Sequence, residues 1–141
     1  MAPSEEKKPI PRKHILIVDN DDVIRTMYET KLSGAGFSIS TLNDITPDFV
    51  EKVASLKPDL ILLDIGFGPG GEEPWGLDAT DALRADPRTA AVKIAYLTNF
   101  ANKTDEARAI QQHVVTYFKK INLIPSQVVE TLKEIFSRGE A

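Results

Sequence analysis

The hydrophobic positions of this chain follow two patterns, short unbroken apolar runs and longer stretches with helical spacing. The run Leu60–Leu63 shows the first pattern, because every position is apolar and the run is too short for a surface helix. Pro58 also disfavours helical conformation at the residue before it. Such a run is typical of a parallel strand buried on both faces. The same pattern predicts strands over residues 14–18, 92–97 and 114–118, and the alternating residues 37–42 predict a strand nearer a sheet edge.

The first stretch with helical spacing follows the acidic cluster at residues 19–22. Either Asp21 or Asp22 can cap a helix there, because a carboxylate accepts hydrogen bonds from the first free backbone N–H groups. The apolar positions of this helix run from Val23 to Leu32, and the glycines at 34 and 36 end it.

Four more helices are expected between and after the other strands. Thr46 and Pro47 have the residue types of an N-cap and a first helical position, so the second helix is predicted to begin there. The remaining helices are predicted over residues 77–86, 105–112 and from Pro125 onwards. Five strands that alternate with five helices through short connections predict an α/β fold, a parallel sheet with right-handed crossovers and helices on both faces.

Composition narrows the class of protein. A chain of 141 residues suits one domain, which we place at residues 13–138 between a disordered proline-containing lead at 1–12 and a short tail at 139–141. The absence of cysteine excludes thiol chemistry and weakly favours a reducing cytosol. A net charge of −4 argues against direct nucleic-acid binding. No apolar segment has the length of a membrane span, so we expect a cytoplasmic protein without a membrane interaction.

Polar residues follow four of the predicted strands. Asp19 and Asn20 follow the first, Asp64 the third, Thr98 the fourth and Lys120 the fifth. The carboxyl ends of parallel strands form the crevice where ligands bind, so these groups are candidates for a site that holds a phosphate and Mg²⁺. A carboxylate nucleophile can accept a phosphoryl group, and a metal, an ammonium and a hydroxyl can neutralise its charge. The alternative is that Asp64 only caps the next turn.

These residues resemble the response-regulator receiver domain of two-component phosphorelays. The resemblance covers roughly residues 13 to 137 and rests on five matching stretches, which are residues 15–19, residues 58–64, Gly76 with Leu83-Arg84, residues 96–98 and residues 117–120. It implies a flavodoxin-like, doubly wound sheet of five strands in the order 2-1-3-4-5.

By this resemblance each strand-end residue has an expected role. Asp64 falls on the phosphoacceptor position, and Asp19 and Asn20 fall on the acidic metal-binding pair. Gly66 falls on the residue whose backbone carbonyl binds Mg²⁺. Thr98 is expected to be the switch hydroxyl, Lys120 the phosphate-binding lysine and Tyr117 the aromatic switch.

Two of these roles have alternatives within the fifth strand. Lys119 competes with Lys120, because successive strand residues point to opposite sides and only one of them reaches the crevice. The three-residue step from Tyr117 favours Lys120. Tyr117 itself could instead be a half-buried strand tyrosine with its hydroxyl in water.

The chain also departs from the family pattern. Asn20 replaces the usual second acid, so we expect weaker Mg²⁺ binding than in a site with two acids. The loop Gly66–Gly76 is longer than usual, and Trp75 in it is expected to cover the third helix rather than form a lid or a partner contact. Asn99 and Phe100 follow Thr98, and their bulk predicts slow phosphorylation and a long-lived phosphorylated form. Ile121 replaces a cis-proline, so a trans bond is expected there.

Three functions compete on these residues. The first is a stand-alone receiver that accepts a phosphoryl group from a sensor histidine kinase or a histidine phosphotransfer protein. It would bind a downstream partner, or a second copy in a homodimer, through its last helices and strand. The second is a pseudo-receiver, a constitutive docking or dimerisation domain without phosphorylation. The third, a Mg²⁺-dependent phosphohydrolase, ranks last because no general acid or base is evident. We therefore expect a phosphoacceptor and not an enzyme.

Overall fold

The protein is an α/β sandwich built on five parallel strands in the order β2-β1-β3-β4-β5. The computed structural model describes residues 12–64, 75–98, 103–119 and 124–139. The strands are β1 (His14–Val18), β2 (Ser38–Leu42), β3 (Leu60–Asp64), β4 (Lys93–Thr98) and β5 (Thr116–Lys119). The helices are α1 (Asp22–Gly34), α2 (Phe49–Leu56), α3 (Trp75–Ala85), α4 (Lys103–Gln111) and α5 (Pro125–Gly139). The predicted fold class, strand order and alternation of elements are confirmed.

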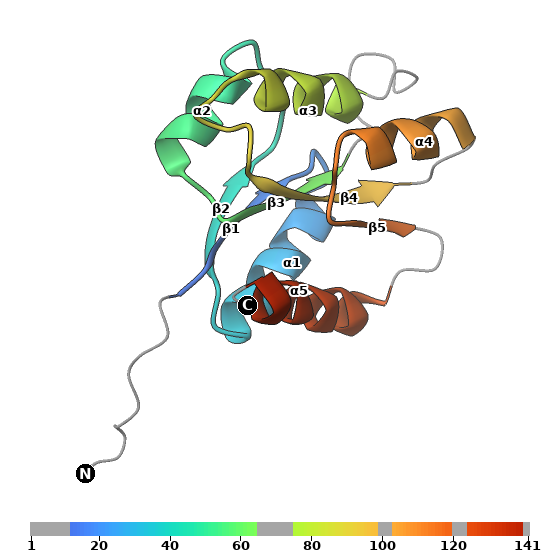
Figure 1. Cartoon of the computed structure of the whole chain (residues 1–141). Coiled ribbons are helices and arrows are strands. Elements are labelled where there is room, and N and C mark those ends of the chain that lie inside the picture. Colours follow the sequence, from blue (N-terminus) through green and yellow to red (C-terminus); the bar gives the residue numbers. More distant parts are fainter. Residues whose placement is uncertain (1–11, 65–74, 99–102, 120–123, 140–141) are drawn as a thin grey trace.

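The sheet separates two hydrophobic cores. Helices α1 and α5 cover one face, and α2, α3 and α4 cover the other (Figure 1). Side chains alternate along β3, so that Leu60 and Leu62 pack in the first core while Ile61 and Leu63 pack in the second. All five residues of β3 are buried, which explains why its sequence is continuously apolar up to Asp64. The last helix buries five apolar residues at helical spacing, which are Val128, Val129, Leu132, Ile135 and Phe136.

The helix ends follow the local chemistry. Of the two predicted caps of α1, the structure has Asp21. Val23, predicted as an apolar position of this helix, is 78% exposed and does not lie in the core. The second helix does not begin at Thr46 and Pro47. It begins at Phe49, because the Phe49 N–H donates to the Thr46 carbonyl at 2.9 Å and closes a turn before the helix.

The fifth strand begins later than predicted, because the chain after α4 is used to end that helix. His113 has a φ of 59°, its N–H donates to the Ile110 carbonyl, and the Val114 N–H donates to the Ala109 carbonyl. These two bonds form a Schellman motif, which satisfies carbonyls at the end of α4. After it the chain pairs with β4: the Val115 N–H donates to the Ile94 carbonyl at 2.8 Å, and the strand itself begins at Thr116.

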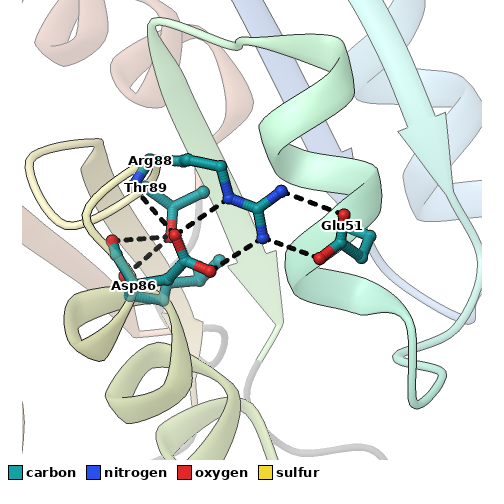
Figure 2. A network of polar contacts seen from close by, with 5 residues as sticks. Glu51, Asp86, Arg88 and Thr89 are labelled. Carbon is teal, nitrogen blue, oxygen red and sulfur yellow. Dashed lines mark hydrogen bonds and ion pairs between the residues drawn. The ribbon is translucent and has the colours of Figure 1, made fainter.

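A polar network links α2 to the loop after α3. The Arg88 guanidinium donates to both carboxylate oxygens of Glu51, at 3.0 and 2.7 Å, and to both of Asp86, at 3.0 and 2.8 Å (Figure 2). The Thr89 hydroxyl donates to the Leu83 carbonyl at 2.7 Å and holds the loop against the end of α3.

Within the described residues, no helix is both long enough and apolar enough to cross a bilayer.

Candidate functional site

Two buried carboxylates stand at the exits of neighbouring strands. Asp19 directly follows β1 and is fully buried, and Asp64 is the last residue of β3 and is 4% exposed. In the sheet register Val18 lies beside Leu63, so the next residue of each strand lies at the same edge. Carboxylates are rarely buried unless they are paired or coordinate a metal, because desolvation disfavours the charge. This pair is therefore the strongest candidate for a functional site in the described part of the chain.

Backbone contacts hold Asp19 in a defined orientation. Its N–H donates to the Leu42 carbonyl at 3.1 Å, which continues the strand pairing by one residue. Its Oδ1 accepts the N–H of Asp21 at 2.8 Å, and the Arg25 guanidinium donates to its carbonyl oxygen at 2.8 Å. Arg25 also contacts Asp22, so its charge is shared within the turn. The turn after β1 is thus built to keep the Asp19 carboxylate at the strand end.

The neighbouring polar residues of this turn have different surroundings. Asn20 is exposed, whereas Asp19 is buried. The Asp21 carboxylate accepts hydrogen bonds from the N–H groups of Val23 and Ile24, at 2.9 and 3.1 Å, and so serves as the helix cap. Its Oδ1 is thus committed to α1, and the family resemblance makes Asn20 the other candidate ligand from this turn.

The backbone of Thr98 ends β4, one residue beyond the position that pairs with Asp64. The three strand exits at 19, 64 and 98 therefore belong to three adjacent strands and one edge of the sheet, as the sequence predicts. Lys119 ends β5 beside Thr98 and is exposed. The predictions for Gly66, Asn99, Phe100, Lys120 and Ile121 lie outside the described residues.

Tyr117 lies half-buried on β5 and contacts α4. Its hydroxyl donates to Glu106 Oε2 at 2.7 Å, and this hydrogen bond raises the pKa of Tyr117. The hydroxyl thus has a protein partner, and the interpretation that it lies only in water is wrong. The predicted switching role of Tyr117 stays a prediction.

The sequence predicts no role for a buried tyrosine whose pKa is affected by Asp19. Tyr28 is fully buried on α1, and burial, followed by the charge of Asp19, raises its pKa to about 12. Its hydroxyl has no hydrogen-bond partner among the residues that the structure describes. A buried unsatisfied hydroxyl costs about 1–3 kcal/mol. In the sequence Tyr28 is only one more apolar position of an amphipathic helix, and that a tyrosine rather than a phenylalanine stands there is the one available signal.

A polar cluster between α3, β4 and α4 was also missed. The Tyr96 hydroxyl lies 2.8 Å from Thr80 Oγ1 and 2.5 Å from Gln112 Oε1, and all three residues are buried. Gln112 Nε2 donates to the Leu77 carbonyl at 2.7 Å and to Asp81 Oδ1 at 2.8 Å. At the surface, Arg108 donates to Asp78 and Asp81, at 2.7 and 2.6 Å, and the two hydrogen bonds that Asp81 accepts lower its pKa. This cluster fastens the end of α4 to α3. Tyr96, its member on β4, lies in the same strand as Thr98.

The donor set at the acidic pair fits Mg²⁺ in its chemistry. Mg²⁺ prefers carboxylate and carbonyl oxygens and keeps several waters, so one or two carboxylates suffice. Within the described ranges, no group of three or more His, Cys, Asp or Glu side chains could hold a metal ion. Asp19 and Asp64 would therefore supply the charge, and the remaining ligands would be neutral oxygens, water or phosphate.

Comparisons with known proteins agree with this architecture. A family model described as response regulator receiver domain matches residues 15–133. The chain is 28% identical over 122 residues to the polar-differentiation response regulator DivK of Brucella anthropi, a match that covers 86% of this chain and 94% of that protein. Two solved structures have a similar fold. Chemotaxis response regulator CheY4 of Vibrio cholerae has a TM-score of 0.73 and 20% identity, covering 88% of this chain and 98% of that one. A CheY-like receiver domain protein of Methanospirillum hungatei has a TM-score of 0.75 and 22% identity, covering 92% and 97%.

Proposed function

Since the chain belongs to the response regulator receiver domain family, we propose that it is a phosphorylation-controlled signalling module that accepts a phosphoryl group on Asp64. The observation that carries the proposal is the buried pair of Asp19 and Asp64 at the exits of adjacent strands. Ligands of open α/β sheets bind at the carboxyl ends of the strands, so a carboxylate at this position is placed to act as a nucleophile.

In the proposed reaction an Asp64 oxygen forms a bond to the phosphorus, and the bond from phosphorus to the donor's leaving group breaks. The Asp19 carboxylate is held by the N–H of Asp21, and its negative charge favours the binding of a divalent cation. Mg²⁺ bound there would neutralise phosphoryl charge. Lys120 and Thr98 would contact the phosphoryl oxygens, roles that rest on the sequence resemblance and on the position of Thr98 at the same sheet edge.

The proposed donor is a sensor histidine kinase or a histidine phosphotransfer protein, and the proposed output is binding of a downstream protein. Three exposed apolar side chains support a binding surface along α4, β5 and α5. Ile110 on α4 is 69% exposed, Val115 before β5 is 39% exposed, and Ile124 before α5 is 51% exposed. All three lie on or next to the elements around the edge strand β5, and a contiguous apolar patch at a surface is typical of interaction sites.

The test uses an acyl-phosphate donor. The chain is incubated with Mg²⁺ and acetyl phosphate, and intact mass is followed with time. We expect one added phosphoryl group that is absent in Asp64→Asn and in the presence of EDTA. Asp59→Asn is the matched control, because Asp59 precedes the same strand at its opposite end and its carboxylate contacts only the His14 N–H among the described residues. It should label like the wild type.

A pseudo-receiver is the second candidate, favoured by the exposed Asn20 in place of a second acid. The same experiment separates the candidates. Stoichiometric labelling supports the receiver, whereas no labelling over hours supports the pseudo-receiver. Repeated consumption of acetyl phosphate without a labelled protein would indicate a phosphohydrolase and would contradict both.

A further inference from the structure

The hydroxyl of Tyr28 is the polar group of the core whose presence the fold does not explain. Its ring packs in the core between α1, β1 and α5 among residues such as Ile17, Leu32 and Val128, which a phenylalanine would fill equally well. The hydroxyl is buried and has no hydrogen-bond partner in the described part of the chain. Buried polar groups are usually satisfied by protein or by ordered water, so an unpaired one requires an explanation.

The charged groups near this hydroxyl belong to the acidic site. Asp19 is close enough that its charge adds to burial in raising the pKa of Tyr28. Arg25, one turn earlier on the same helix, is already committed to the Asp19 carbonyl and to the Asp22 carboxylate. The Asp19 carboxylate is itself held by the Asp21 N–H through Oδ1. Ile15 and Ile17 of β1 pack in the same core as Tyr28, and the strand pairing continues to Asp19, so the alternation of side chains places Asp19 on the face of the sheet that α1 covers.

We propose that Tyr28 is a positioning residue of the divalent-cation site, whose hydroxyl shares an ordered water molecule with the Asp19 carboxylate and so orients that carboxylate toward the cation. The inference rests on the proposed function, since it concerns the same acidic pair. Groups behind metal ligands fix the orientation of the ligands, and their loss typically weakens metal binding. A water molecule is the partner because Tyr28 makes no direct hydrogen bond to Asp19.

The test compares two tyrosines that each lose only a hydroxyl. Mg²⁺ affinity is measured by isothermal titration calorimetry for the wild type, Tyr28→Phe and Tyr96→Phe, and the unfolding midpoint is measured in urea without Mg²⁺. We expect Tyr28→Phe to weaken Mg²⁺ binding roughly tenfold and to leave the midpoint unchanged or higher. Tyr96→Phe, whose hydroxyl has two protein partners away from the acids, should lower the midpoint and leave the Mg²⁺ affinity unchanged.

Each other result has one meaning. Equal Mg²⁺ affinity in Tyr28→Phe and the wild type overturns the inference and leaves the proposed function standing. Equal weakening in both phenylalanine variants also overturns it, because the effect would then be a general one of destabilisation. No Mg²⁺ binding by the wild type overturns both the proposed Mg²⁺ site and this inference. Intact Mg²⁺ binding without phosphoryl labelling counts against the proposed function alone.

Discussion

Two buried tyrosines on opposite faces of the sheet show how differently the same side chain is used. Tyr28 packs in the core under α1 and α5, and Tyr96 packs in the core under α2, α3 and α4. Both are fully buried, and burial is the largest cause that raises the pKa of each to about 12. Tyr96 contacts Thr80 and Gln112, whereas Tyr28 has no partner among the described residues. Equal burial therefore does not imply an equal role.

The surroundings of the two hydroxyls explain the difference. Because one hydroxyl proton serves one acceptor at a time, Tyr96 can donate to Gln112 Oε1 while it accepts from the Thr80 hydroxyl. That chain of bonds continues through Gln112 to the Leu77 carbonyl and stabilises the docking of α4 on α3. Around Tyr28 the packing is apolar, and the charge of Asp19 adds to burial in raising its pKa. The first region holds helices together, and the second borders the candidate site.

The largest expected effect is at Gln112, the centre of the polar cluster. Gln112→Leu leaves the Tyr96 hydroxyl, the Leu77 carbonyl and Asp81 each without one partner. We expect it to lower the free energy of unfolding by about 2–4 kcal/mol, measured by urea denaturation. Gln111→Leu is the control, because Gln111 directly precedes Gln112 as the last residue of α4 and is exposed. Similar losses in both variants would show that the cluster is not what stabilises this region.

Alkaline pH tests the two buried phenols directly. In the folded protein the pKa of each phenol is about 12, above the ordinary value of 10.0. The stability that each protonated phenol contributes is therefore fully present below pH 10 and is lost as the pH rises toward 12. Each tyrosine can account for up to about 2–3 kcal/mol of that loss. The measurement is urea unfolding between about pH 9 and pH 12. Tyr28→Phe and Tyr96→Phe should each flatten the decline, and an unchanged slope in both would contradict the raised pKa values.

At neutral pH the same two variants separate the hydroxyls by stability. We expect Tyr96→Phe to lower the free energy of unfolding by about 1–2 kcal/mol, because the buried Gln112 Oε1 loses the hydrogen bond that the Tyr96 hydroxyl donates to it. Tyr28→Phe should cause no loss, since it removes a hydroxyl without a partner in the described structure. Thermal and urea unfolding without Mg²⁺ measure both. A clear loss of stability in Tyr28→Phe would mean that the hydrogen bond of this hydroxyl to water or protein serves to stabilise the fold.

The smallest effect is expected at the network of Figure 2, which is polar but exposed. Arg88 binds Glu51 through two hydrogen bonds, and these lower the pKa of Glu51. That contribution is present above the ordinary pKa of Glu51 and is lost as the pH falls through the lowered value. Because solvent screens exposed ion pairs, Glu51→Gln should unfold at a midpoint indistinguishable from the wild type at pH 7. A midpoint shift as large as that of Tyr96→Phe would show that this exposed ion pair stabilises the protein as much as a buried hydrogen bond does.

The sequence by itself determined the fold class, the strand order implied by the family resemblance, and the placement of Asp19, Asp64 and Thr98 at strand ends. These features could be predicted because each depends on local patterns: an apolar run forms a buried strand, and the first polar residue after it marks the exit. Helix caps were predictable for the same reason, as at Asp21. The start of α2 was not, since Thr46 closes a turn instead of capping the helix.

Only the tertiary structure decided which side chains meet. Gln112 binds the carbonyl of Leu77, 35 residues earlier, and Tyr117 binds Glu106 on another element. That the Tyr28 hydroxyl has no partner among the described residues, and that the charge of Asp19 affects its pKa, follow from how α1 packs on β1 and α5. Periodicity marks a position as buried, but it does not reveal the neighbours of that position. The apolar pattern that predicts burial can be read within one segment. A hydrogen bond, or its absence, depends instead on the distance between two segments that only packing brings together.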